Sequence, residues 1–495
     1  MKKYIIYPFL LMLVAVVSCS KLKEQPYSSI YTDNFYKTAS DAEAALVSAY
    51  SPIADMAAGP VLTMCGDFSA DQVYPRPVVG RNTFTLFNYD VNYTSQKSYA
   101  RQNESPEQIW QSCYLGIENS NWIILKVPNT NMDPVRRGQI LAEAFYLRAF
   151  YLWFLTKNFN EVVIKTTPST DLSAAYVGKS PAADVYKQIY SDLDTAIAGL
   201  PDYSTGIVKG RPSRQVAQAL FAKAALYNQD WANALQMAQT VLASNLYSLM
   251  PNVLDVYDVT KKDAARAENM WAFESERTSP GRSGQIMGLY GPKNSDGPAY
   301  GKQTFGSIFA YPVFFSSFNP IDKRRQLLDT EYVNNQGQIV TQANVTPITP
   351  KGVLVKKYMD PNSIGGASAC NIPILRLADV YLIAAEAEAH LNGATTTAYG
   401  YINTVRSRAG LPGLTAGLGP DAFVDSVLQE RSWEFFAEGD RWYDLTRTNT
   451  FLQVIPGAVN DVYPVRTPAA KFRYFPIPQD EINANPKLTQ NEGWQ

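Results

Sequence analysis

The chain has 495 residues, with 44 lysines and arginines against 45 aspartates and glutamates. Because these charges nearly balance, the composition gives no reason to expect nucleic acid or a strongly acidic partner. One histidine is present and no His-Glu-x-x-His or Cys-x-x-Cys spacing occurs, so the sequence lacks the signals of a transition-metal site or a Ser-His-Asp triad. The length exceeds one typical core and predicts an elongated or two-lobed body.

The first 18 residues have the pattern of a cleaved export signal. Two lysines precede an apolar run from Tyr4 to Val17, which is shorter than the roughly 20 residues of a membrane-spanning helix. The run ends in Ser18-Cys19, and a small residue before a cysteine at this place is similar to a bacterial lipobox. We therefore predict that Cys19 carries lipid that holds the protein on a membrane. The alternative is an ordinary signal peptide with an incidental cysteine.

Apolar residues recur at helical spacing through much of the first half. Ser40 and Glu43 have the spacing of a capping box and predict the start of the first helix after the signal. Helices over residues 109–125 and after Pro134 are expected to pair antiparallel. Further helices are predicted over residues 180–200, 212–227 and 231–242.

Two more helices, over residues 374–391 and 398–409, repeat the hairpin arrangement in the second half. Their unit of about 35 residues is close to the period of tetratricopeptide-like helix pairs, although the full consensus of that repeat is absent. The predicted fold is therefore mostly α, with tetratricopeptide-like helix pairs that form a scaffold.

Two irregular segments, 59–105 and 246–372, interrupt the helical pattern. The second contains short strand-like pieces between Gly, Pro, Ser and Asn clusters. Loops on a rigid scaffold commonly carry binding residues, and an aromatic face can cover the C–H side of a sugar ring while polar groups bridge its hydroxyls. The predicted ligand-binding residues are Tyr74, Arg76, Arg81, Tyr89 and Tyr93 in the first segment and Arg282, Tyr290, Asn294 and Tyr300 in the second. For each one alone, packing within the loops is the competing interpretation.

The densest charged cluster lies near the end of the chain and includes Glu430, Glu434 and Glu438 at four-residue spacing. Arginines and large apolar residues alternate with these carboxylates, which is typical of ion pairs that tie a helix to its neighbours. Two carboxyls about 5 to 9.5 Å apart around an open site would instead indicate a glycosidase, and the sequence alone does not exclude that pair. We interpret the cluster as structural. His390 is expected to have a helix-end or packing role, and the free cysteines to be buried thiols.

Short motifs in a single order cover nearly the whole chain after Cys19. They are Asp33–Tyr36, Leu141–Tyr151, Gly210–Ser213, Leu375–Leu382, Ala385–Ala387, Ile402–Leu411, Glu430–Phe435, Glu438–Leu445, Pro476–Pro478, Asn485–Pro486 and Gln490–Asn491. Together they resemble the SusD/RagB family of outer-membrane nutrient-binding lipoproteins. Two places depart from the family pattern: Asn158–Val163 lacks a glycine-containing turn, and Ser20–Glu24 lacks the acidic run that often accompanies surface display.

The resemblance implies a SusD-like fold with an irregular, loop-rich ligand-binding face. After the signal peptide (1–18), an N-terminal part with helical repeats (19–245) and a C-terminal part (246–495) would form one compact body.

The implied function is capture of an oligo- or polysaccharide, without catalysis or a cofactor; the sequence does not indicate calcium and leaves open whether calcium assists. The implied partner is a SusC-like TonB-dependent transporter, over which the protein would act as a hinged lid. The implied location is the outer membrane of a Gram-negative bacterium, lipid-anchored and facing the exterior. The alternatives are a peptide cargo, a lipid-anchored hydrolase, or repeats that serve only as an assembly scaffold.

Overall fold

The computed structural model describes residues 35–58, 61–77, 81–93, 104–171, 176–278, 283–284, 286–293, 299–344 and 351–495. The predicted lipidation site Cys19 and two predicted ligand residues, Arg282 and Asn294, lie outside this part of the chain. No helix within it is long and apolar enough to span a membrane.

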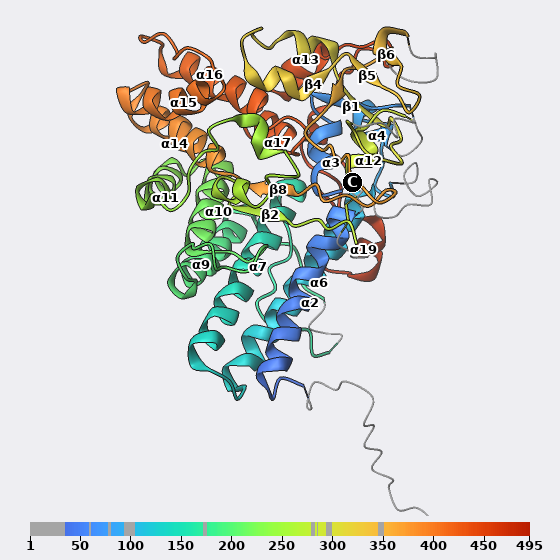
Figure 1. The fold of residues 1–495 in the computed structure, drawn as a ribbon. Helices are drawn as coiled ribbons and strands as arrows, with labels where there is room; N and C mark the ends of the chain where they lie inside the picture. Colours follow the sequence, from blue (N-terminus) through green and yellow to red (C-terminus); the bar gives the residue numbers. More distant parts are fainter. Residues whose placement is uncertain are drawn as a thin grey trace, which may run out of the picture.

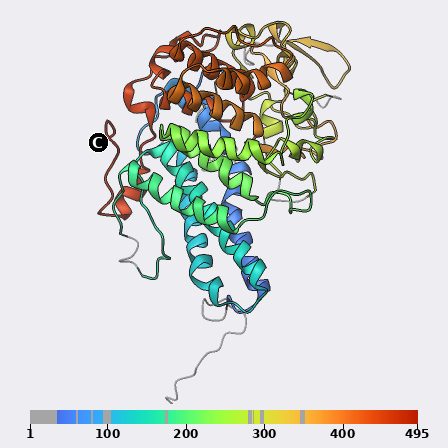
Figure 2. The same ribbon diagram turned by 90° about the vertical axis from the view of Figure 1, so that its left-hand side faces the viewer.

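A succession of long helices forms the scaffold, and each helix packs on the next (Figure 1). Their bounds are α2 Ala39–Ala58, α6 Pro106–Lys126, α7 Pro134–Phe159, α9 Ala182–Gly199, α10 Arg214–Tyr227, α11 Trp231–Ser244, α14 Leu377–Asn392, α15 Thr396–Arg408 and α16 Pro420–Glu434. Figure 2 shows them layered from the cyan helices at the bottom to the orange helices at the top. The expected antiparallel partners α6 and α7 are in contact, and the predicted mostly α scaffold of helix pairs is confirmed.

Shorter helices connect and cover this scaffold. The α-helices are α3 Val61–Phe68, α4 Asn82–Leu86, α12 Ile286–Tyr290, α13 Pro312–Ser316, α17 Arg441–Arg447, α18 Phe451–Val454 and α19 Gln479–Ala484. The 3-10 helices are η2 Val127–Asn129, η3 Val253–Val256, η4 Ala264–Ala267, η5 Lys323–Leu327, η6 Gln342–Asn344, η7 Ile455–Gly457 and η8 Ala470–Arg473. Among them, α3 and α17 pack together although they are far apart in sequence.

The described strands are short and form two-stranded antiparallel pairs. They are β1 Val73–Pro75, β2 Trp271–Phe273, β3 Ile308–Ala310, β4 Leu328–Asp329, β5 Glu331–Val333, β6 Ile339–Thr341, β7 Leu354–Val355 and β8 Ile372–Leu375. The pairs are β1 with β3, β2 with β8, β4 with β7 and β5 with β6. The prediction that a helix begins at Ile374 is wrong, because β8 pairs with β2 there and the backbone of Arg376 is still extended.

The first helix is capped two residues before the predicted position. The hydroxyl of Thr38 accepts a hydrogen bond from the Asp41 N–H at 3.3 Å, and the Asp41 carboxylate accepts from the Thr38 N–H at 2.9 Å. This reciprocal arrangement satisfies backbone donors at the helix start. Ser40 therefore lies inside α2 and is not its cap.

Buried ion pairs tie α16 to the rest of the second half. The carboxylate of Glu434, the last residue of α16, accepts from Arg408 at 2.6 Å, Arg376 at 2.9 Å and Arg324 at 3.1 Å. Glu438 lies beyond the helix, so the predicted helical face ends at Glu434, yet Glu438 also pairs with Arg376, at 2.8 Å. The five side chains are each exposed by 5% or less, and this agrees with the structural interpretation of the charged cluster.

The remaining chemically distinctive residues also have packing roles. His390 lies in the last turn of α14 and stacks on Trp231, with ring centroids 3.9 Å apart. Cys65, Cys113 and Cys370 are free and buried, and burial raises the pKa of each thiol. Within the described residues, no cluster of three His, Cys, Asp or Glu side chains could hold a metal ion.

Candidate ligand-binding site

The two irregular segments form one surface, which we call the loop face. β1 of the first segment pairs with β3 of the second, with Tyr74 opposite Phe309, and the Arg76 N–H donates to the Ser307 carbonyl at 2.9 Å. Figure 1 shows α4, α12 and β1 together on one side of the scaffold, with β4–β6 above them. The described residues of the loop face are 61–77, 81–93, 283–284, 286–293, 299–344 and 351–371.

The structure corrects most of the ligand-binding residues predicted for this face. Six of their side chains are buried, with exposed fractions of 4% or less: Tyr74, Arg81, Tyr89, Tyr93, Tyr290 and Tyr300. These side chains fill the interior beneath the loops. They have no open face to offer a sugar, so they stabilise the loop face and do not line its surface.

Several of the buried side chains use their polar ends within the protein, whereas the hydroxyls of Tyr74 and Tyr89 form no hydrogen bond in the described structure. The Tyr93 hydroxyl donates to the Pro476 carbonyl at 2.6 Å, and the Tyr290 hydroxyl donates to the Asp67 carboxylate at 3.2 Å. The guanidinium of Arg81 makes two hydrogen bonds of 2.7 Å to the Glu104 carboxylate. Of the predicted residues within the described chain, Arg76 alone is partly exposed, and its ligand contact stays a prediction.

Phe305 is an aromatic side chain that the loop face does expose, with 46% of its surface open. Its ring lies over Gly288, where a Cβ atom would come within 2.8 Å of the ring, and its N–H donates to the Gly288 carbonyl at 2.7 Å. Gln303 and Gly306 have φ angles of 56° and 57°, so the loop bends on both sides of the ring. The prediction from sequence missed Phe305; the glycine-bounded run Gly301–Gly306 is the signal that could have indicated it.

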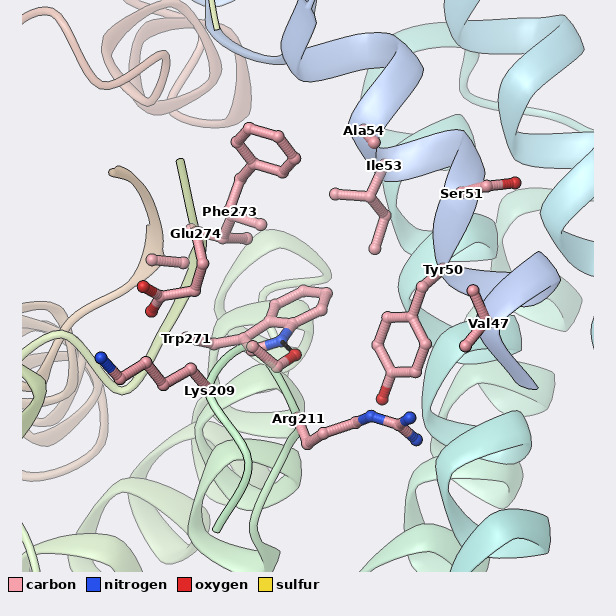
Figure 3. Close-up of a pocket in the computed structure, with 13 residues that line it drawn as sticks. Val47, Tyr50, Ser51, Ile53, Ala54, Lys209, Arg211, Trp271, Phe273 and Glu274 are labelled. Atoms are coloured by element: carbon pink, nitrogen blue, oxygen red, sulfur yellow. Dashed lines mark hydrogen bonds between the residues drawn. The ribbon is translucent and has the colours of Figure 1, made fainter. Parts of the chain in front are cut away.

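A cavity of about 450 Å³ lies between α2, which leads into the first irregular segment, and β2, which belongs to the second (Figure 3). Its lining residues are Val47, Tyr50, Ser51, Ile53, Ala54, Lys209, Gly210, Arg211, Trp271, Ala272, Phe273, Glu274 and Ile374. Figure 3 shows the Trp271 ring pointing across the cavity toward Tyr50, with Lys209 and Glu274 on the side opposite α2. The volume is within the range of small-molecule cavities.

Arg211 and its neighbours fix one wall of this cavity. The Tyr50 hydroxyl and the Arg211 guanidinium donate to the same Glu143 oxygen, at 2.7 and 2.8 Å. Burial raises the pKa of Tyr50 well above its usual value. The Gly210 backbone has a φ of 80°, and its carbonyl accepts from the Trp271 indole at 2.9 Å. The Gly210-Arg211 motif is therefore a structural feature of this wall.

Glu274 is the one carboxylate among the described lining residues. Burial raises its pKa, although a hydrogen bond of 2.7 Å from the Asn371 amide acts in the opposite direction. Lys209 is ion-paired with Asp263. Most glycosidases place two carboxyl groups around the sugar, and the described lining of this cavity contains one.

Similarity to known proteins covers most of the chain. The family described as "SusD family" matches residues 299–494, and the family described as "Starch-binding associating with outer membrane" matches residues 26–226. Starch-binding protein SusD of Bacteroides thetaiotaomicron is 34% identical, over 82% of this chain and 82% of its own. The chain belongs to the SusD family. Another SusD-family relative, SusD-like protein P25 of Formosa agariphila, is 27% identical over 99% of this chain and 98% of its own.

Solved structures of SusD-like proteins have the same fold. A SusD homolog from Bacteroides thetaiotaomicron superimposes with a TM-score of 0.79 at 20% identity, over 94% of this chain and 98% of the other. A laminarin-binding SusD-like protein gives a TM-score of 0.77 at 24% identity, over 92% and 100% of the two chains. The arrangement of scaffold and loop face is therefore that of the SusD family.

Proposed function

We propose that this SusD-family protein captures an oligo- or polysaccharide at the cell surface and passes it to a SusC-like TonB-dependent transporter. The observation that carries the proposal is similarity over most of the chain to a starch-binding protein. Structures with the same fold include a laminarin-binding protein and a surface glycan-binding protein from Bacteroides uniformis. In this proposal the protein captures the glycan without cleaving it.

On the loop face, the Phe305 ring supports glycan binding most directly. An exposed aromatic ring covers the C–H side of a pyranose, while neighbouring polar groups bond its hydroxyls. Arg76 lies beside the same loop, because its N–H is bonded to the carbonyl of Ser307, two residues after the ring. The cavity beside Glu274 offers a second place for a sugar unit.

The experiment measures binding and product formation by the mature protein, beginning after Cys19, with starch, laminarin and a peptide mixture. We expect retention by one glycan without release of shorter products. The Phe305→Ala variant should bind that glycan about 5- to 10-fold more weakly, equivalent to roughly 1–1.4 kcal/mol. Leu125→Ala, which truncates a side chain of 50% exposure on α6, is the matched control and should bind normally.

The outcomes separate the alternatives. Retention of peptides alone would favour a peptide-capturing lid, and release of shorter sugars would favour a hydrolase. If Phe305→Ala binds like the unchanged protein while Glu274→Gln binds more weakly, the glycan lies in the cavity of Figure 3. No binding to any of these ligands would contradict nutrient capture and favour an assembly scaffold.

The transporter and the lipid anchor are tested in the membrane. We propose that lipid on Cys19 places the protein on the exterior of the outer membrane, where it acts as a lid. A TonB-dependent transporter should co-purify with the tagged full chain from detergent-solubilised outer membranes, and Cys19→Ser should release the protein from the membrane. Protease added to intact cells should degrade it; protection from protease would contradict surface display.

A further inference from the structure

Two adjoining cavities lie beside the C-terminal segment, and neither shares a lining residue with the cavity of Figure 3. The smaller, of about 240 Å³, lies between the end of α7, the start of α9, the end of α10 and α17. The larger, of about 510 Å³, is bounded by the last residues of the chain. Asn160, Arg473 and Tyr474 line both, so the two cavities meet at these side chains.

Lys157 lines the smaller cavity and is 8% exposed. Its amine lies over three aromatic rings, 4.2 Å from the centroids of Phe154 and Tyr443 and 4.5 Å from that of Trp153. Within the described residues, no oxygen accepts a hydrogen bond from this amine. Burial lowers the pKa of Lys157 to about 7, although the charge of Asp440 acts in the opposite direction. A buried amine thus belongs to the lining of a cavity and has no anionic contact among the described residues.

Lys223 and Lys357, the other two buried lysines of the described chain, are paired differently. Lys223 forms ion pairs with Asp440 at 2.7 Å and Asp379 at 2.9 Å. Lys357 pairs with Glu438 at 2.6 Å. Because a buried charge is costly unless it is paired, two of these sites contain their own counterion, and the Lys157 site does not.

Three more polar atoms at the smaller cavity have no partner. The hydroxyls of Thr156 and Tyr227 and the Nε of Arg473 are buried and form no hydrogen bond within the described structure. All three residues line the same cavity as Lys157, and none of its described lining residues is an aspartate or a glutamate. An unsatisfied buried polar group costs about 1–3 kcal/mol, so a ligand acceptor that reached these groups would be stabilised by them.

Another cation of the cavity, Arg447, is already neutralised. Its guanidinium pairs with Glu386 and Asp444. The lining groups without a hydrogen-bond partner in the described structure are therefore the amine of Lys157, the two hydroxyls and the Nε of Arg473. Donor groups of this kind, at a cavity whose described lining has no carboxylate, complement an oxyanion better than a cationic group.

We propose that the smaller cavity binds an oxyanion, a carboxylate or sulfate group, carried by a small ligand whose hydroxylated body fills the adjoining larger cavity. The face of Tyr474 and the amide of Asn160, which line both cavities, are positioned for such a body. A sugar acid has this chemistry. The site shares no residue with the loop face, so its occupation does not depend on where a neutral glycan binds.

The test is calorimetric titration of the mature protein with glucuronate, inorganic sulfate and glucose at constant ionic strength. We expect glucuronate to bind at least 10-fold more tightly than glucose. Lys157→Met, which retains an aliphatic side chain among the three rings, should lose at least 10-fold in glucuronate affinity. Lys187→Met makes the same charge change at an exposed position on α9 and should bind normally. Phe305→Ala should also bind glucuronate normally, which separates this site from the proposed glycan surface.

The arms of the experiment identify the source of the oxyanion. Glucuronate binding more tightly than sulfate supports a sugar acid, whereas sulfate binding equally well supports a site for the oxyanion alone. If Lys157→Met does not fold, Arg473→Leu, which removes the unpaired Nε from the rim, should give the same loss. Equal affinity for glucose and glucuronate, or full glucuronate affinity in the folded variants, would overturn the proposal.

Discussion

At the residue scale, Asp67 is a buried carboxyl without a cationic partner in direct contact. It accepts hydrogen bonds from the Gly439 N–H at 2.9 Å and the Tyr290 hydroxyl at 3.2 Å. Burial raises the pKa of Asp67 from 3.8 to about 7. Between these values the folded protein retains a proton that the unfolded chain has lost, so this group lowers the free energy of unfolding as the pH rises from about 4 to 7.

Asp67→Asn removes this pH dependence, because the amide has no charge to bury. Relative to the unchanged protein, the variant should gain roughly 3–4 kcal/mol in free energy of unfolding between pH 4 and pH 8. Urea unfolding at several pH values measures the difference. Asp71→Asn is the control of opposite sign: burial raises the pKa of Asp71, but the Arg441 guanidinium at 2.8 Å outweighs it and the net pKa is lowered. Parallel pH profiles of Asp67→Asn and the unchanged protein would contradict the prediction.

The tyrosines of the loop face show that the burial of a side chain is hard to predict from sequence. Residue type and irregular surroundings indicate a binding segment, but they do not distinguish a ring that faces the ligand from a ring that fills the core. Tyr89 packs against Phe475 and Trp494, which lie close to the other end of the chain. Such contacts depend on the tertiary fold, so residue type alone does not separate the buried tyrosines from an exposed ring such as Phe305.

At the element scale, helical periodicity located the long helices but not their ends. The start of α2 gives a direct test, because the predicted cap Ser40 and the observed cap Thr38 are two residues apart. Thr38→Ala should lower the free energy of unfolding by about 1 kcal/mol, since it leaves helix-start donors unsatisfied. Ser40→Ala should change it by less than about 0.5 kcal/mol, because Ser40 is exposed within the helix. A larger loss in free energy of unfolding for Ser40→Ala than for Thr38→Ala would instead support Ser40 as the cap, as predicted from sequence. Thermal or urea unfolding of both variants decides between them.

Ends of elements are hard to predict because tertiary pairing competes with local preference. Ile374 continues the apolar pattern of α14 toward the N-terminus, yet β2 pairs with β8 and keeps the chain extended until Arg376. Helix α14 therefore begins only at Leu377. The order of the motifs still identified the SusD-like fold. No single fragment decides the family, because the identification depends on the whole series of fragments occurring in the same order.

At the scale of the whole molecule, Arg376 joins segments that are distant in sequence. Its guanidinium pairs with Glu268 and Glu434 at 2.9 Å and with Glu438 at 2.8 Å, and the four side chains are each exposed by 5% or less. Removing the cation leaves three buried carboxylates with fewer partners, and breaking a buried ion pair costs about 3–5 kcal/mol. Arg376→Met should therefore lower the free energy of unfolding by roughly this amount.

The matched control for Arg376→Met is Arg214→Met, which breaks an exposed ion pair with Asp202 of 3.1 Å. Exposed pairs contribute less than about 1 kcal/mol, so this variant should unfold close to the midpoint of the unchanged protein. Guanidinium-induced unfolding of both variants measures the two costs on the same scaffold. Equal small effects would show that the segments joined by Arg376 are held by apolar packing alone. A large effect confined to Arg376→Met would establish that the charged motifs of the second half stabilise the body that supports the loop face.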